Sequence, residues 1–149
     1  MPEPKKKIKI LFVDDNDMMR IFFGDIFWLH GLEAEFSVAT SATVEEAEPY
    51  LVSDDLRPDI VFFDMPLRES HNNANVAKME TGFEFLKRIK SDPKLAKVKT
   101  VLFTSNGDRE ILERIEEVGV DAIIVKSNSM SEDVMHTVEK FAPHAAATS

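Results

Sequence analysis

Aspartates directly follow two apolar runs of this chain. Asp14 and Asp15 come after the run Ile8–Val13, and Asp64 comes after Ile60–Phe63. Three carboxylates gathered in one crevice repel one another and cost free energy unless a cation lies between them. Hard oxygen ligands of this kind suit Mg²⁺. If the fold brings the three carboxylates together, they predict a magnesium site.

Hydroxyl residues and a lysine occupy the equivalent positions later in the chain. Thr104 and Ser105 follow the run Thr100–Phe103, and Lys126 follows Ala122–Val125. A carboxylate beside a bound Mg²⁺ and an ammonium group can attack phosphorus and become an acyl phosphate. The metal and the ammonium neutralise the developing charge, and a hydroxyl can bond a phosphoryl oxygen. These residue types therefore indicate phosphoryl transfer to a carboxylate.

Each of these residues has an ordinary structural interpretation when it is taken singly. An Asp after a strand commonly caps a helix or a turn, and Thr is a favoured strand residue. Their joint occurrence at the ends of apolar runs favours the phosphoryl site. The histidines show no spacing typical of metal ligands, so exposed or loop positions are expected for them. They are His30, His71, His136 and His144.

The elements that must position these residues alternate between strand and helix. Short apolar runs predict strands at Ile8–Val13, Glu35–Ala39, Asp59–Phe63, Thr100–Phe103 and Ala122–Val125. A helical pattern or a capping motif follows each run. Such alternation requires parallel strands with right-handed crossovers, and hence a three-layer α/β sandwich with helices on both faces. The carboxyl ends of the strands then meet at one edge, where ligands collect in such sheets.

Capping residues predict where the first helix lies. It is expected to begin at Asn16 or Asp17 and to end at Gly31. Its apolar residues recur at helical spacing as Ile21, Phe22, Ile26 and Leu29.

Two capping boxes mark the starts of later helices. Thr43 with Glu46 precedes the second helix, in which Pro49 predicts a kink or a late start. Ser129 with Glu132 precedes the last helix. Between these helices, the segment Met65–Thr81 takes roughly 17 residues where such connections usually take about two to six. A loop of this length is expected to be functional or mobile.

Composition limits the function classes. Hydrophobic residues make up 44% of the chain and charged residues 30%, as in globular domains. The net charge of −9 argues against nucleic-acid binding, and the basic arm 1–7 is expected to be solvated. The chain has no Cys, and no apolar run reaches the roughly 18 residues of a membrane span. A cytoplasmic protein with no membrane partner is expected, with a frayed tail at 143–149.

The strand-end motifs resemble those of a known family. They are Leu11–Asp15, Val61–Asp64, Val101–Ser105 and Ile124–Lys126. In this order they resemble a response-regulator receiver domain of two-component systems, of the lone CheY-like kind, over almost all of Ile8–Phe141. The resemblance implies a flavodoxin-like doubly wound (βα)5 sandwich with strand order 2-1-3-4-5. It also implies that 1–149 is a single receiver domain.

The resemblance further implies a role for each matching residue. Asp64 is the expected phosphoacceptor, Thr104 the switch hydroxyl and Lys126 the cation that contacts the phosphoryl group. The expected ligands of Mg²⁺ are Asp14, Asp15, Asp64 and the backbone carbonyl of Pro66. A histidine kinase or a histidine phosphotransfer protein would donate the phosphoryl group, and an unidentified downstream protein would read the result. The domain would act on itself and not as an ordinary enzyme.

Four departures from the family pattern bear on its mechanism. Ser127 follows Lys126 where the family usually has Pro, so a trans bond is expected there. Pro66 has no N–H to offer a phosphoryl oxygen. Ile123 stands where many members have Tyr or Phe, and the segment Met65–Thr81 is unusually long. The departures at Ser127 and Pro66 keep open an adaptor that works independently of phosphorylation.

Two other functions share this architecture. A Mg²⁺-dependent phosphohydrolase of the haloacid-dehalogenase type needs a second Asp two residues after the nucleophile, and Pro66 stands there instead. A flavin- or nucleotide-binding domain needs a Gly-rich loop after a strand, and the five glycines of the chain form none. Phosphate-monoester turnover or visible flavin absorbance would reveal them.

Overall fold

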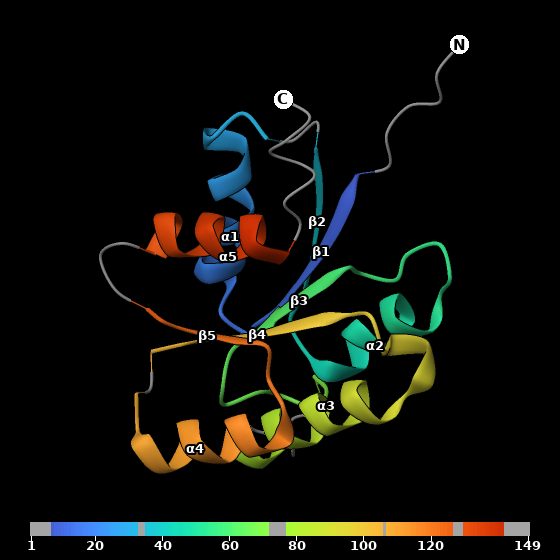
Figure 1. Cartoon of the computed structure of the whole chain (residues 1–149), viewed down its shortest axis with the longest axis vertical. Helices are drawn as coiled ribbons and strands as arrows, with labels where there is room; N and C mark the ends of the chain where they lie inside the picture. Colours follow the sequence, from blue (N-terminus) through green and yellow to red (C-terminus); the bar gives the residue numbers. More distant parts are fainter. Residues whose placement is uncertain (1–6, 33–34, 72–76, 106, 127–129, 142–149) are drawn as a thin grey trace.

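Five strands and five α-helices alternate along the chain in the computed structural model (Figure 1), which describes residues 7–32, 35–71, 77–105, 107–126 and 130–141. The strands are β1 Ile8–Val13, β2 Phe36–Ser41, β3 Ile60–Phe63, β4 Lys99–Thr104 and β5 Ala122–Val125. The helices are α1 Asp17–Leu29, α2 Val44–Val52, α3 Met79–Ser91, α4 Arg109–Val118 and α5 Met130–Phe141, with a 3₁₀ turn η1 at Pro93–Leu95.

The strands form one parallel sheet in the order β2-β1-β3-β4-β5. The register aligns Val13 with Phe63 and Phe63 with Leu102, so these strands end close to one another. On the far side of β4, Thr104 pairs with Val125. The predicted flavodoxin-like α/β fold and its strand order are confirmed.

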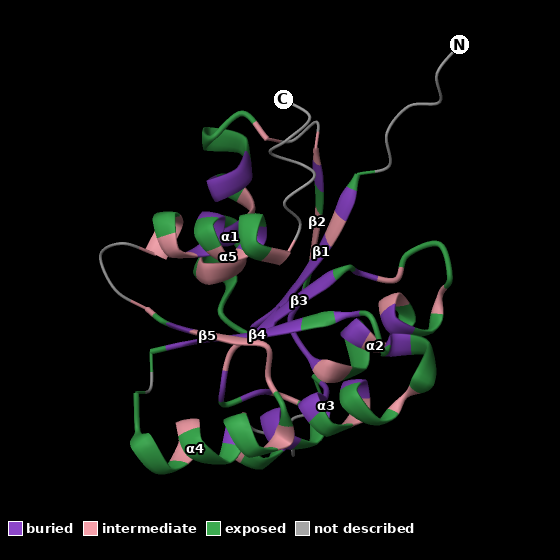
Figure 2. Cartoon of the chain, viewed as in Figure 1, coloured by how far each residue is buried: buried purple, intermediate pink, exposed green. Residues whose placement is uncertain are grey.

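The central strands β1, β3 and β4 are buried on both faces because helices cover both sides of the sheet (Figure 2). Ile10 and Phe12 of β1 face α1 and α5, whereas Leu11 and Val13 face α2, α3 and α4. This alternation explains why the strand is a continuous apolar run. On the α1 side, the rings of Phe12 and Phe23 stack with centroids 4.3 Å apart.

Helix α1 begins and ends where its capping residues predict. The Asn16 side chain accepts a hydrogen bond from the backbone N–H of Met19, and Gly31 adopts a φ of 67° after the helix. The buried residues of α1 are Phe23, Ile26 and Phe27. Of the residues expected at helical spacing, Ile21, Phe22 and Leu29 are therefore exposed. Apolar residues occupy most of the circumference of this helix, so their spacing does not identify the buried side.

Helix α2 begins directly after Thr43, whose hydroxyl accepts a hydrogen bond from the N–H of Glu46 at 3.1 Å. Pro49 lies inside the helix, so the late start that it predicted is wrong. The capping box before α5 and the turn after Lys126 involve residues 127–129, which lie outside the described residues.

The long connection between β3 and α3 is shorter than predicted because α3 begins at Met79. Leu67 and Lys78 form an antiparallel bridge across the loop. The backbone carbonyl groups of Arg68 and Glu69 accept hydrogen bonds at 2.9 Å from the first two N–H groups of α2. These N–H groups have no partner inside their own helix, so the loop supplies acceptors that the helix needs.

Candidate functional site

The carboxyl ends of β1, β3 and β5 bring two carboxylates and one ammonium group together. Lys126 Nζ lies 2.7 Å from Asp64 Oδ2 and 3.5 Å from Asp14 Oδ2. These three residues are up to 112 positions apart in the chain, and only the parallel strand order unites them. The ammonium group partly offsets the repulsion between the two carboxylates.

Asp14 is the buried member of this group. Its Oδ1 accepts a hydrogen bond from the backbone N–H of Asn16 at 3.0 Å, whereas its buried Oδ2 has no hydrogen-bond partner. Burial raises the pKa of the Asp14 carboxyl to about 6, although the Asn16 N–H opposes the shift. The charge of Asp64 raises this pKa further, and Lys126 lowers it. Ionisation of Asp14 beside the charged Asp64 therefore costs free energy unless a further cation is present.

Asp64 is the member that solvent reaches. Its side chain is 15% exposed, compared with 3% for that of Asp14. Asp64 Oδ1 accepts a hydrogen bond from the backbone N–H of Met65 at 2.7 Å, and Oδ2 accepts one from Lys126. A carboxylate oriented by two donors at a strand end, and open on one side, is suited to act as a nucleophile.

Thr104 at the end of β4 lies beside this group. Its buried hydroxyl donates a hydrogen bond to the backbone carbonyl of Met65 at 3.3 Å. The backbone N–H of Lys126 donates to the carbonyl of Thr104 at 2.7 Å, which ties the lysine to β4. Thr104 thus contacts the backbone next to Asp64.

Two of the predicted metal ligands occupy different surroundings. Asp15 and Pro66 are exposed, whereas Asp14 is buried and Asp64 is partly buried. Within the described part of the chain, no three or more His, Asp or Glu side chains are arranged as a metal site. The structure therefore brings two of the three expected carboxylates together.

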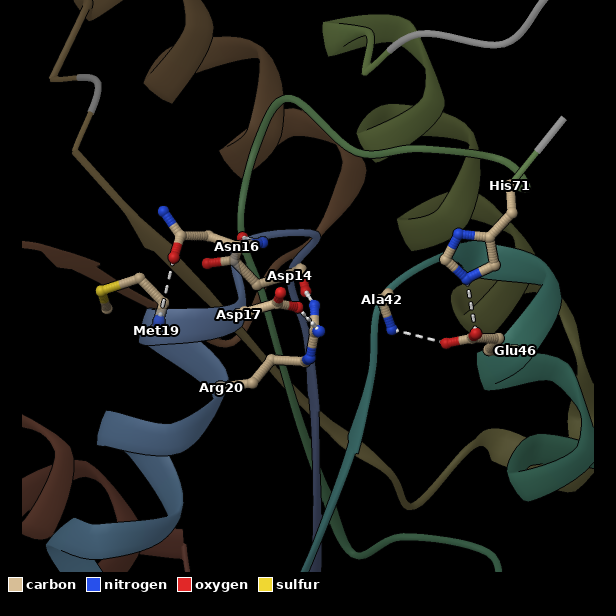
Figure 3. A network of polar contacts seen from close by, with 8 residues as sticks. All are labelled: Asp14, Asn16, Asp17, Met19, Arg20, Ala42, Glu46 and His71. Carbon is tan, nitrogen blue, oxygen red and sulfur yellow. Dashed lines mark hydrogen bonds and ion pairs between the residues drawn. The ribbon is translucent and has the colours of Figure 1, made fainter. Parts of the chain in front are cut away.

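Figure 3 shows a polar network around this edge that the sequence did not reveal. Arg20 Nη1 donates a hydrogen bond to the backbone carbonyl of Asp14 at 2.7 Å and pairs with Asp17. The spacing of Asp17 and Arg20, three residues apart on a helix, was the available signal. These contacts fix the turn that follows β1.

A second contact in Figure 3 joins the long loop to α2. His71 Nε2 lies 2.6 Å from Glu46 Oε1, and Glu46 Oε2 accepts the N–H of Ala42 at 2.8 Å. The bond from Ala42, followed by that from His71, holds the pKa of Glu46 below its usual value. The loop position expected for His71 is confirmed, but no local pattern identified its partner 25 residues away.

Comparisons with known proteins agree with this arrangement. Residues 10–139 match the family model "Response regulator receiver domain". The response regulator protein VraR of Staphylococcus epidermidis is 31% identical over 133 residues, which cover 89% of this chain and 56% of that protein. The chain thus spans about half the length of this curated relative.

Solved structures show the same fold. The chemotaxis response regulator CheY4 of Vibrio cholerae has a TM-score of 0.71 at 21% identity, covering 91% of this chain and 99% of that one. The phosphorylated cyanobacterial phytochrome response regulator RcpA has a TM-score of 0.70 at 23% identity, covering 97% of each chain. No helix within the described ranges is long and apolar enough to cross a membrane. The strand-end residues and the family match together show that the chain belongs to the response regulator receiver domain family.

Proposed function

We propose that this receiver domain accepts a phosphoryl group on Asp64 and then signals through contacts with other proteins. The donor would be a histidine kinase or a histidine phosphotransfer protein in the cytoplasm. The observation that carries the proposal is the position of Asp64, whose side chain is 15% exposed and whose Oδ2 lies 2.7 Å from the Lys126 ammonium group.

The charges around Asp64 favour this transfer. A carboxylate oxygen of Asp64 forms a bond to phosphorus while the bond from phosphorus to the imidazole nitrogen of the donor breaks, and that nitrogen keeps the electron pair. Lys126 offsets the negative charge that gathers on the phosphoryl oxygens. Asp14 is too buried to receive a protein-bound phosphohistidine, so it supports the site as a second negative charge.

The residues at this edge are chemically suited to Mg²⁺. The buried Asp14 Oδ2 has no hydrogen-bond partner, and a hard cation would satisfy it. Asp14, Asp64 and the carbonyl of Pro66 would hold the ion, and Asp15 would join them by turning inward. Bound Mg²⁺ would supply positive charge next to the phosphoryl oxygens.

Thr104 would report the phosphorylation. Its hydroxyl donates to the Met65 carbonyl and can instead donate to a phosphoryl oxygen on Asp64. These two arrangements exclude each other, because a hydroxyl has one hydrogen to donate. Phosphorylation would therefore bias β4 between two states.

Helix α1 offers a surface for the protein contact. Its exposed apolar side chains form a group that we call the α1 patch, made of Met18, Ile21, Phe22, Trp28 and Leu29. Exposed apolar patches mark protein interaction sites. The helix starts immediately after Asp14 and Asp15, so a partner on the α1 patch would lie next to the edge of the sheet that carries Asp64.

The experiment is phosphorylation by a small donor such as acetyl phosphate with Mg²⁺, followed by intact-mass analysis. Wild type should gain one base-labile phosphoryl group, Asp64→Asn should gain none, and the matched control Asp25→Asn should behave as wild type. Asp25 is an exposed carboxylate on α1. Equal incorporation in Asp64→Asn, or none in wild type, would contradict the proposal.

A further inference from the structure

A groove of about 680 Å³ lies at the opposite edge of the sheet from Asp64. It is bordered by the residues that begin β1, β3 and β4, by the η1 turn and by Phe141 at the end of α5. These strands run away from the groove toward the edge of the sheet that carries Asp64. The groove is therefore separate from the site described above.

The groove is positively charged although the chain carries a net charge of −9. Two carboxylates, those of Asp54 and Asp59, line it. Its cationic side chains are Lys7, Lys9, Arg57, Lys94, Lys97 and Lys99. One third of the lysines and arginines of the chain thus gather in one concave place. Concave surfaces of one sign concentrate ions of the other sign.

Part of this charge serves the fold. Arg57 Nε donates a hydrogen bond to the carbonyl of Leu51 in the last turn of α2 at 3.1 Å, and its guanidinium group pairs with Asp54. Lys9 Nζ donates to the backbone carbonyl of Asp55. Cations near a helix C-terminus are expected because its carbonyl groups carry partial negative charge.

The remaining cations have no such task. Lys7, Lys94 and Lys97 are exposed, and within the described ranges their ammonium groups form no hydrogen bond or ion pair. The carboxylate near Lys94, that of Asp92, is already paired with Arg88 at 2.8 Å. Lys99 Nζ lies over the Phe141 ring, 5.9 Å from its centroid. Like charges held together in this way repel one another unless anions lie between them.

The strand register shows how widely the lysines of the groove are spread. Ile10 pairs with Ile60, and Ile60 pairs with Lys99, so Lys9 and Lys99 are two strands apart. Neighbouring strands are about 4.8 Å apart, so the backbones of β1 and β4 are roughly 10 Å apart. A chain of several phosphate groups can contact lysines on both sides at once, and so can neutralise more of these charges than one phosphate. The volume is also that of a small-molecule site.

We infer that this groove binds a small polyphosphate, either free or attached to a nucleoside. Its phosphate groups would contact the lysines of residues 94–99 on one side and Lys7, just before β1, on the other. Phe141 lines the groove, and a base could stack on its ring when Lys99 moves from the ring to a phosphate group.

Titration calorimetry and amide chemical shifts of the metal-free full chain test this inference, with ATP, inorganic tripolyphosphate and inorganic phosphate as probes. ATP and tripolyphosphate should bind more tightly than phosphate and should shift the amides of residues 94–99. The double variant Lys94→Ala/Lys97→Ala should weaken tripolyphosphate binding about tenfold or more. Both lysines are exposed, so their removal should leave the fold intact.

The matched control removes two cations elsewhere. Lys87→Ala/Arg109→Ala loses the same charge from exposed positions of α3 and α4 and should change the affinity by less than about twofold. Phe141→Ala separates the two sources of phosphate: a loss for ATP only indicates a nucleoside-linked ligand, and no selective loss indicates a free polyphosphate.

Three results would overturn the inference. The first is the absence of amide shifts in the groove with every probe. The second is an equal loss of affinity in both double variants, which would indicate attraction by overall charge. The third is tighter binding of a poly-glutamate peptide than of tripolyphosphate, which would make the groove a site for an acidic protein segment.

Discussion

Two aspartates at neighbouring strand ends differ in what they can do because their surroundings differ. Asp14 is enclosed between the β1 end and the turn capped by Asn16, whereas Asp64 faces solvent beside Lys126. Residue type alone does not separate a metal ligand from a nucleophile. Between Asp14 and Asp64 the exposure of the side chain does, because a phosphoryl donor has to reach the nucleophile.

The buried charge of Asp14 leads to a prediction about stability. Asp14→Asn keeps the acceptor for the Asn16 N–H but removes a buried charge that faces Asp64. In metal-free protein at neutral pH, the free energy of unfolding should rise by about 1–3 kcal/mol. Urea unfolding with and without Mg²⁺ measures this, and Mg²⁺ should stabilise wild type but not the variant.

The control is Asp25→Asn, which removes an exposed carboxylate on α1 and should leave the free energy of unfolding almost unchanged. A metal-free Asp14→Asn protein that is less stable than wild type would show that the carboxylate is a net stabilising group.

At the scale of elements, α3 approaches the segment that follows β3 closely, because Gly82 of α3 has no side chain. A Cβ atom at this position would lie 2.5 Å from Met65 Cγ. Met65 is the residue whose N–H bonds Asp64 and whose carbonyl accepts the Thr104 hydroxyl. The packing of α3 and the geometry of the acceptor are therefore connected through one side chain.

This contact predicts opposite effects of two glycine substitutions. Gly82→Ala should lower the free energy of unfolding by about 1–3 kcal/mol, because Met65 must move to make room. Gly24→Ala in α1, where no atom lies within 4 Å of the added Cβ, should raise it by up to about 1 kcal/mol through helix propensity. Urea unfolding compares them, and equal stabilisation by both would contradict the close approach of α3 to Met65.

At the scale of the whole molecule, Asp121 before β5 joins three elements. Its carboxylate accepts hydrogen bonds from Lys90 of α3 at 2.8 Å and from the backbone N–H and the hydroxyl of Thr100 in β4. Burial acts to raise the pKa of Asp121, but Lys90 and Thr100 outweigh it and hold the pKa below 3.8. The charged form therefore stabilises the folded state.

The lowered pKa sets the pH range in which Asp121 contributes. Above pH 3.8 the charged Asp121 carboxylate contributes fully to the free energy of unfolding. This contribution is lost as the pH falls through the lower pKa that Asp121 has in the folded state. Asp121→Asn should lower the free energy of unfolding by about 1–2 kcal/mol at neutral pH. Urea unfolding at a series of pH values should show this difference shrinking below about pH 4. A difference that stays constant into acid would mean that the charge of Asp121 does not matter.

The sequence by itself determined the order of the elements and most of their limits. Continuous apolar runs such as that of β3 indicate strands buried on both faces, and cap residues such as Asn16 and Thr43 mark helix starts. The parallel sheet then follows from the alternation, and so does the meeting of Asp14, Asp64 and Lys126 at one edge. These features depend on local periodicity and capping, which a single segment carries.

Only the tertiary structure decided which side of each segment is used. In the folded chain Phe23 packs against Phe12, and the α1 patch is exposed. Asp15 is also exposed, and His71 pairs with Glu46. Lysines from distant segments line one groove. The physical reason is that these outcomes depend on contacts between residues far apart in the chain. Such contacts are set by how the layers pack. The spacing of residues within one segment does not show which surface will pack against that segment.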